Sequence, residues 1–232
     1  MSVDTKSTTL MKTGARGFLL GPRVRKLVLT AHLVSSIGWL GAVAGFAALD
    51  ISALNDRNAQ VVSAAYLSMA LITRFVIVPL AITALLTGLI QALGTPWGLF
   101  RYYWVLAKLG LTLLATVVLL QKVALINYAA SQASKPQLSG VALQALGRPL
   151  ALHSVGGLLV LFVITTVSVY KPWGLTAYGK RILREQGFVP TLGSARATWR
   201  WVYVAGIFLL LLLVGMQHFH HLSGALLEHH RH

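Results

Sequence analysis

Five long apolar stretches constrain this chain more than any other feature of its sequence. A transmembrane helix needs about 20 mainly apolar residues, because the hydrocarbon core of a bilayer is about 30 Å thick. Charged residues make up only 11% of the 232 residues, less than half of the roughly 25% that soluble domains carry. A soluble globular enzyme is therefore excluded, and the sequence predicts an all-α, polytopic transmembrane helical bundle. The predicted spans are 27–49, 75–93, 103–126, 150–170 and 201–216, and the apolar segment 61–72 could extend the second of them.

Basic residues are distributed unequally between the two ends of these spans. Of the 20 Lys and Arg residues, thirteen lie in 1–26, 94–102 and 171–200, whereas five lie in the alternate connections and the C-terminal tail. Positively charged connections stay in the cytoplasm, so the sequence predicts a cytoplasmic N-terminus and an extracytoplasmic C-terminus. The same rule explains the excess of Lys and Arg by the orientation of the chain in the lipid bilayer, so a nucleic-acid partner is not expected.

Two connections between spans carry the same motif. Pro-Trp-Gly-Leu occurs at 96–99 and at 172–175, and a Tyr follows each copy three residues later, so the offset is 76 residues. Applied to the first span, this offset aligns His32 with Lys108. The repeat predicts two helical hairpins related by an approximate two-fold axis along the membrane normal, as in parallel-repeat transporters. Coincidence between two ordinary interfacial turns is the alternative.

The domain organisation follows from the spans and the repeat. Residues 1–24 are polar and predict a disordered cytoplasmic arm. Residues 25–180 contain the predicted four-helix transmembrane core with pseudo-two-fold symmetry. Residues 181–232 contain a linker, one extra C-terminal span and a His-rich extracytoplasmic tail.

The sequence contains no cysteine, which excludes disulfides, iron–sulfur clusters, thiolate zinc sites and covalently attached c-type haem. Eight His and four Met are left as soft or redox-capable metal ligands. Phosphate-binding loops, zinc-protease motifs and nucleophile elbows do not occur in the sequence.

His32 and Lys108 are the strongest candidates for chemistry. Ionisable groups inside a bilayer cost several kcal/mol and usually face a partner, a cavity or a cofactor. The alternative for His32 is a neutral imidazole bonded to a neighbouring helix, and for Lys108 a side chain that extends to the lipid headgroups. Residues on or near the same helix faces complete the candidate cofactor-binding site: Ser36, Arg101, Trp104 and Thr112.

The other histidines are candidate metal ligands. His153 enters the fourth span from the outer side, where Arg74 is expected just before the second span. A rise of 1.5 Å per residue puts His153 about 20 Å from His32 along the membrane normal, too far for one haem to lie between them. A satisfied interfacial histidine is the alternative. In the tail, His218, His220 and His221 could bind copper, zinc or nickel, whereas Glu228 and the His-rich end that follows it resemble an altered expression tag.

The segments HLVSSIGWLG at 32–41, GTPWGLFRYYWVLAK at 94–108 and VYKPWGLT at 169–176 resemble a family of four-helix bacterial integral membrane proteins common in actinobacteria. That family is distantly similar to copper-resistance protein D and to HemJ-type protoporphyrinogen oxidase. The resemblance covers about 24–180 and implies the fold. The HemJ-type enzyme binds b-type haem and has an essential His in its first span and Trp-x-x-x-Lys in its third, so the resemblance implies roles for His32, Trp104 and Lys108. The Pro-Arg-Leu segment that follows the His in that enzyme is absent here.

Three functions remain open at this stage. The first is a membrane protein that binds haem b in a redox role. It would be a membrane oxidoreductase whose partner is a quinone or another electron-transfer molecule. In it His32 is an axial ligand, and Lys108 is either the opposite ligand, as a neutral amine, or a nearby cation. The second is a handler of copper or another transition metal, with His32, His153 and the tail histidines as ligands. The third is an accessory subunit without a cofactor. Each would lie in the bacterial plasma (inner) membrane, either alone or as a homo-oligomer.

Overall fold

The computed structural model describes residues 20–95, 98–134, 140–171, 174–185 and 187. The described chain is almost entirely helical, and four of its helices are long and apolar enough to cross a membrane. These are Pro22–Asn55, Ala59–Gly94, Tyr103–Ala133 and Gly147–Tyr170. They contain the first four predicted spans, which confirms the polytopic all-α bundle. The fifth predicted span and the His-rich tail lie outside the described residues.

The helices are longer than the apolar stretches that predicted them. Helix α1 covers Pro22–Asn55, α4 covers Tyr103–Ala133 and α5 covers Gly140–Tyr170. At 1.5 Å per residue, the 34 residues of α1 extend about 50 Å, well beyond the roughly 30 Å of a hydrocarbon core. The ends of the helices therefore project past the apolar stretches.

The second crossing is one long helix with an irregular turn. Helix α2 (Ala59–Ile72) continues through the π-helical turn η1 (Thr73–Ile77) into α3 (Val78–Gly94), so the apolar segment 61–72 does extend this span. Pro79 explains the irregular turn, because proline has no N–H and its ring clashes with the carbonyl four residues earlier. Arg74 was expected just before the span but lies inside this helix, because apolar residues continue on both sides of it.

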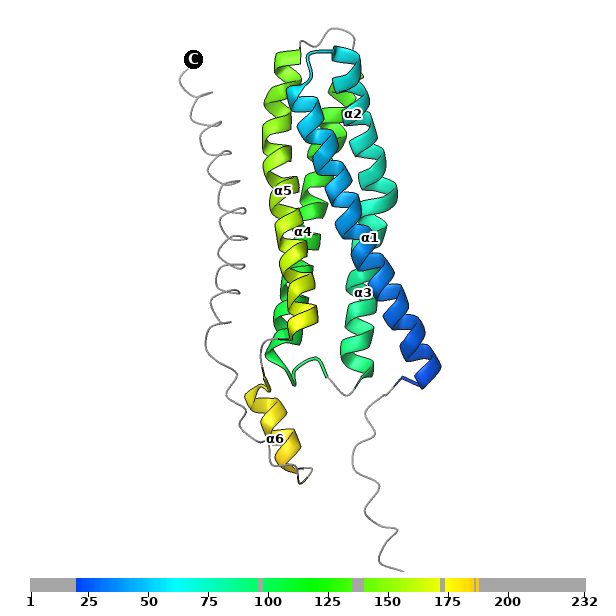
Figure 1. The fold of residues 1–232 in the computed structure, drawn as a ribbon, viewed down its shortest axis with the longest axis vertical. Helices are drawn as coiled ribbons and strands as arrows, with labels where there is room; N and C mark the ends of the chain where they lie inside the picture. Colours follow the sequence, from blue (N-terminus) through cyan, green and yellow to red (C-terminus); the bar gives the residue numbers. More distant parts are fainter. Residues whose placement is uncertain (1–19, 96–97, 135–139, 172–173, 186, 188–232) are drawn as a thin grey trace, which may run out of the picture.

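The four crossings form a closed ring. Helix α1 packs against α2, α3 and α5, and α4 packs against the same helices from the opposite side. An offset of 76 residues would relate α1 to α4 and the second crossing to α5, so this ring has the arrangement that the pseudo-two-fold prediction requires. Helix α6 (Ala177–Glu185) follows α5 and lies beyond the end of the bundle (Figure 1).

The two repeated turns pair with each other. Tyr102 forms an isolated antiparallel bridge with Leu175, and the Thr176 amide donates to the Arg101 carbonyl at 2.9 Å. The Thr176 hydroxyl donates to the Phe100 carbonyl at 2.6 Å across 76 residues. An antiparallel pairing between equivalent segments is the pattern that a two-fold axis between them produces.

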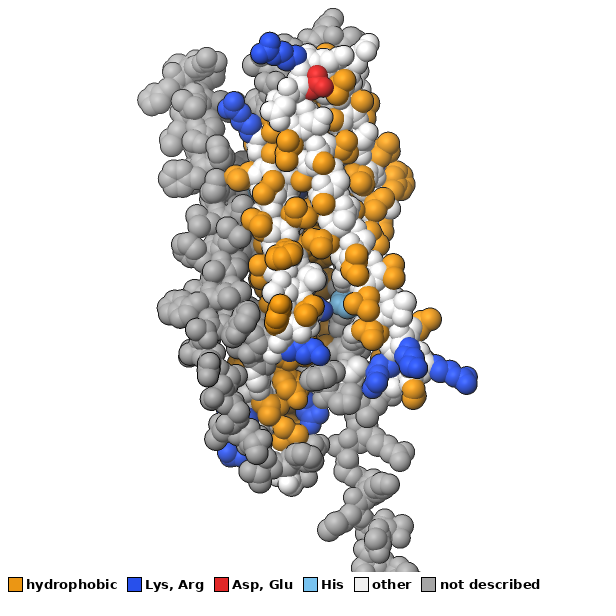
Figure 2. Space-filling model, viewed as in Figure 1, with side chains coloured by type: hydrophobic (Ala, Val, Ile, Leu, Met, Phe, Trp, Pro, Cys, Tyr) orange, Lys and Arg blue, Asp and Glu red, His pale blue; other side chains and the backbone are white. Residues whose placement is uncertain are grey.

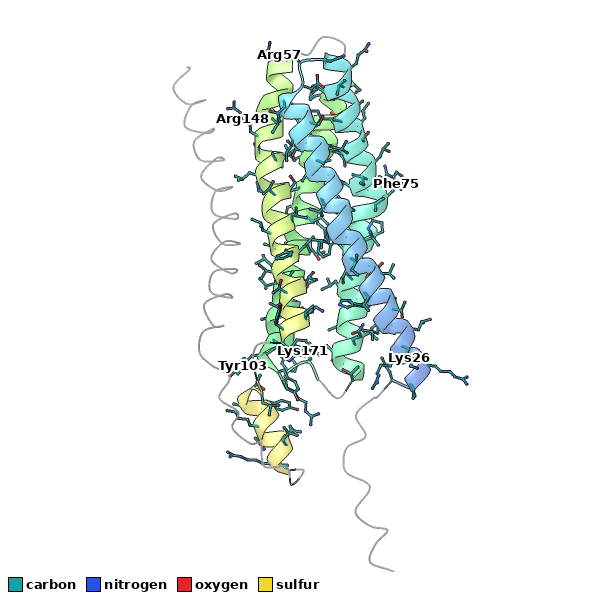
Figure 3. All side chains as sticks on the ribbon, viewed as in Figure 1. Lys26, Arg57, Phe75, Tyr103, Arg148 and Lys171 are labelled. Carbon is teal, nitrogen blue, oxygen red and sulfur yellow. The ribbon has the colours of Figure 1, made fainter. Side chains whose placement is uncertain are left out.

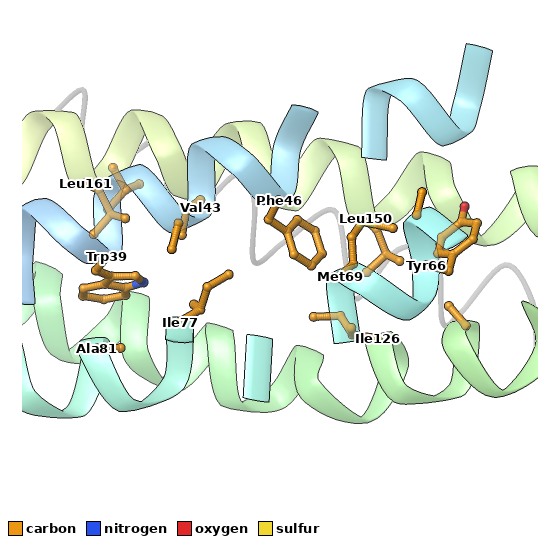
Figure 4. Close-up of a cluster of buried hydrophobic side chains, with 14 of the residues drawn as sticks. Trp39, Val43, Phe46, Tyr66, Met69, Ile77, Ala81, Ile126, Leu150 and Leu161 are labelled. Atoms are coloured by element: carbon orange, nitrogen blue, oxygen red, sulfur yellow. The ribbon is translucent and has the colours of Figure 1, made fainter. Parts of the chain in front are cut away.

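The core and the surface of the bundle are both apolar. Large side chains fill the core along its length, among them Trp39, Phe46, Tyr66, Met69 and Leu161 (Figure 4). Outward-facing side chains such as Ile37, Phe75 and Phe162 are 63–66% exposed, and the hydrophobic side chains in Figure 2 cover the middle of the bundle while Lys and Arg gather near its ends. A continuous exposed apolar surface of this kind is a lipid-facing surface, so the chain is an integral membrane protein.

Candidate functional site

The orientation of His32 is determined by the second crossing. The imidazole is buried, at 7% exposure, and its Nδ1 lies 3.0 Å from the Ala84 carbonyl oxygen and 3.2 Å from the Thr87 hydroxyl. A carbonyl only accepts hydrogen bonds, so Nδ1 carries a proton and donates it to Ala84. In the neutral imidazole, Nε2 is then the nitrogen with a free lone pair.

Lys108 completes this arrangement from α4. Its Nζ lies 3.1 Å from His32 Nε2, so the lysine extends into the bundle rather than toward the lipid headgroups. Because Nε2 accepts, Lys108 donates. The two residues lie at one depth and are separated by 76 positions, as the repeat predicts. This hydrogen bond joins two helices that are far apart in sequence.

The pair lines a cavity of about 380 Å³, which we call the His32 cavity. This volume is within the range of small-molecule sites. Five pairs of its lining residues are separated by 76 positions: Leu29 and Val105, His32 and Lys108, Leu33 and Leu109, Ala92 and Ser168, and Thr95 and Lys171. Equivalent residues can face one space in this way only if the approximate two-fold axis passes through it. The His32 cavity therefore lies on the axis of the bundle.

The other predicted cofactor residues divide into two groups. Trp104 and Thr112 line the His32 cavity, and the Thr112 hydroxyl donates to the Lys108 carbonyl at 2.8 Å. Ser36 is half-buried on α1 and does not line this cavity, whereas its neighbour Ser35 is buried and donates to the His32 carbonyl. Arg101 lies in the paired turns, where its carbonyl accepts from Thr176, and is not a lining residue.

Two residues that line the His32 cavity were not predicted from the sequence. Lys171 lines the His32 cavity, with its Nζ 5.9 Å from the centre of the Trp104 ring, and is the repeat equivalent of Thr95. Extending the offset to the residue before each Pro-Trp-Gly would have found it. Gly88 faces His32, because a Cβ there would lie 3.1 Å from His32 Cε1. Helical patterning alone carries no signal for that close approach.

The candidate metal residues do not come together in the described chain. His153 lines a second, smaller cavity with Lys122, while the Arg74 guanidinium lies 5.5 Å from the centre of the Phe75 ring and does not line it. Within the described ranges, no three His, Asp or Glu side chains form a group that could hold a metal ion. The tail residues His218, His220 and His221 lie outside those ranges.

The geometry around His32 can be compared with what a haem requires. Metal-bound histidines usually donate their other ring N–H to a carbonyl or carboxylate, and the bond to Ala84 supplies this. Two axial ligands would need their nitrogens about 4 Å apart, given iron–nitrogen bonds of about 2 Å, but His32 Nε2 and Lys108 Nζ are 3.1 Å apart. In this conformation the Nε2 lone pair accepts from Lys108, so His32 would bind iron only after the lysine side chain turned aside, and Lys108 would then be a cation beside the ligand.

Comparison with known proteins adds no identification: no family model, no curated protein and no solved structure matches this chain.

Proposed function

We propose that this protein binds a b-type haem in the His32 cavity and serves a redox role in the bacterial plasma membrane. The observation that carries the proposal is the orientation of His32. Its Nδ1–H is donated to the Ala84 carbonyl, so Nε2, which accepts from Lys108 in this conformation, is the nitrogen that would bind iron once the flexible lysine side chain turned aside. When bound, the haem would supply one-electron chemistry.

The remaining walls of the His32 cavity suit a planar, apolar ligand with acidic groups. Leu29, Leu33, Leu85 and Leu109 provide apolar surface. Lys108 and Lys171 provide positive charge, and no Asp or Glu occurs among the described lining residues. The carboxylates of a ligand could therefore pair with these lysines, because no acidic side chain of the described lining competes for them. Arg101 lies in the paired turns and would add a third cation.

Each of these residues would have a different role in holding the haem. His32 would bind iron through Nε2, and the bond to Ala84 keeps the ring from turning. Lys108 would hold a propionate or donate a hydrogen bond beside the iron, and Trp104 would cover one side of the cavity. Gly88 leaves room for the imidazole edge.

The orientation in the membrane is part of the proposal. Lys26 and Lys171 lie near one end of the bundle, and Arg57 and Arg148 lie near the other (Figure 3). The first end also carries Arg23, Arg25 and the three basic residues of α6, so the positive-inside rule places it in the cytoplasm. The His32 cavity then lies in the cytoplasmic half of the membrane, where an electron donor from the cytoplasm could reach it.

The test is an absorption spectrum of the detergent-purified protein, with haem quantified per polypeptide. Wild type should show a Soret band, and His32→Ala should lose it. The matched control is His153→Ala, which removes the other described intramembrane histidine and should keep the haem. Lys108→Met should shift the spectrum or weaken retention. Full haem occupancy in His32→Ala would refute the site.

A colourless wild-type protein would also refute the proposal. Copper in that protein would favour metal handling, and a metal-free protein that co-purifies with a partner would favour an accessory subunit.

A further inference from the structure

Helix α6 is joined firmly to the paired turns. Thr176 is its N-cap, because the Thr176 hydroxyl accepts from the Gly179 amide at 3.0 Å and donates to the Phe100 carbonyl at 2.6 Å. Gly179 is buried, and a Cβ at that position would overlap the Arg101 carbonyl. The start of α6 therefore has a fixed position at the end of the bundle, and each of its sides has a fixed direction.

One side of α6 carries two adjacent cations without an acidic partner. Lys180, Arg181 and Arg184 are all exposed. Arg181 bonds to Glu185 at 3.0 Å, so those two charges balance each other. Lys180 and Arg184 are four positions apart and are therefore neighbours on the helix surface, and among the described residues neither forms an ion pair. We call these two residues the Lys180–Arg184 face.

The other side of α6 is apolar. Ile182 and Leu183 are half-buried, and Tyr178 is 55% exposed. A helix with a strongly charged face and an apolar face typically lies at the membrane interface, and Tyr is enriched at the same level. Helix α6 begins seven residues after α5 ends at Tyr170 and lies just beyond the end of the bundle (Figure 1). This is the level at which lipid headgroups surround a bundle.

The positive charge at this end is not balanced by the described part of the chain. Arg23, Arg25 and Lys26 at the start of α1 are exposed as well. Glu185 is the one acidic residue described at this end, and Arg181 already engages it. The ligand that complements the Lys180–Arg184 face is therefore an anion, and phosphate accepts strong, charge-assisted hydrogen bonds from Lys and Arg.

We propose that the Lys180–Arg184 face binds the headgroup of an anionic phospholipid. Both side chains donate to its phosphate, and its acyl chains extend into the bilayer beside the bundle. An anionic lipid is favoured over a zwitterionic one, whose own ammonium group competes for the phosphate. Thr176 is a positioning residue, since it orients α6 without touching the lipid. The site lies outside the His32 cavity, so lipid binding does not require haem.

The binding test uses native mass spectrometry of the full-length protein in micelles that contain equal amounts of phosphatidylglycerol and phosphatidylcholine. Wild type should retain phosphatidylglycerol preferentially. The double variant Lys180→Gln/Arg184→Gln should reduce this preference about 5- to 30-fold, the equivalent of ~1–2 kcal/mol for two charges near an anionic headgroup.

The matched control removes two exposed cations from the opposite end of the bundle. Arg57→Gln/Arg148→Gln causes the same loss of net charge and should keep the wild-type preference. An unchanged preference in Lys180→Gln/Arg184→Gln, or an equal loss in the control, would overturn the proposal.

A second pair of variants distinguishes a positioned site from general attraction to positive charge. Thr176→Val keeps every charge but removes the hydroxyl that joins α6 to the paired turns, so it should weaken the preference several-fold. Thr166→Val is the control, because the Thr166 hydroxyl bonds only within α5, and it should match wild type. An unchanged preference in Thr176→Val would refute the positioned site.

Two further measurements separate this proposal from its alternatives. Inorganic phosphate at the concentration of the lipid should leave phosphatidylglycerol bound, and displacement would assign the face to a soluble anion. Equal retention of the two lipids by wild type would also refute the lipid site and leave the face to an acidic protein. His32→Ala should retain the wild-type preference, so failure of the haem proposal leaves the lipid result intact.

Discussion

The contact between His32 and Lys108 predicts a measurable coupling energy. The perturbation is a double-mutant cycle with His32→Leu and Lys108→Met, which replace both side chains with apolar groups of similar volume. Hydrogen bonds to charged groups contribute about 1.5–3 kcal/mol, and a buried group that loses its partner bears its own desolvation cost. Each single variant should therefore be destabilised by about 1–3 kcal/mol, because it leaves the other residue unpaired.

The double variant distinguishes a direct interaction from two independent defects. It removes both polar groups, so its destabilisation should be smaller than the sum of the two singles by about 1–3 kcal/mol, the range seen for residues in contact. The free energy of unfolding is measured by reversible titration with a denaturing detergent in mixed micelles. Additive effects within about 0.5 kcal/mol would refute the contact. The bond from His32 Nδ1 to Ala84 is lost in both variants that lack His32, so it cancels in the cycle.

Two other expectations concern the cavity wall and the membrane. Gly88→Ala should disturb His32, since the added Cβ would lie 3.1 Å from its Cε1 and the ring would have to move by a few tenths of an ångström; reduced haem retention measures this. Gly41→Ala is the control, because a Cβ there meets nothing within 4 Å, and it should be neutral or stabilising by up to about 1 kcal/mol. Reporter fusions after residues 20 and 225 should lie in opposite compartments, as five spans require, and both ends in the cytoplasm would eliminate the fifth span.

Most of the fold could be predicted because membrane crossing leaves few alternatives. Apolar length and the backbone's need for internal hydrogen bonds dictate helices, and the structure contains four of those predicted. The limits of the helices could not be predicted in the same way. Residues 50–55 and 127–133 continue their helices beyond the apolar stretches, because helical hydrogen bonding persists where side chains become polar.

The candidate site was predictable to the extent that the repeat encoded it. One offset from two Pro-Trp-Gly motifs put His32 opposite Lys108, and the two are in contact. The partners of Nδ1 were not predictable, because Ala84 contributes a backbone carbonyl that any residue would offer. The π-helical turn was also missed. Pro79 lies just after it, but the apolar pattern from which the span was predicted carries no signal for a wider turn.

The passage of the symmetry axis between His32 and Lys108 has a consequence for ligand orientation. In a dimer of identical hairpins, each residue on the axis would face its own copy, and two lysines about 3 Å apart would repel each other. A single chain containing both hairpins is free of that restriction. One side of the His32 cavity can present an imidazole while the equivalent side presents an amine, and Lys171 can stand opposite Thr95. A flat molecule entering the cavity therefore meets two chemically different faces, and its two orientations, which a symmetric dimer would bind equally, differ in energy.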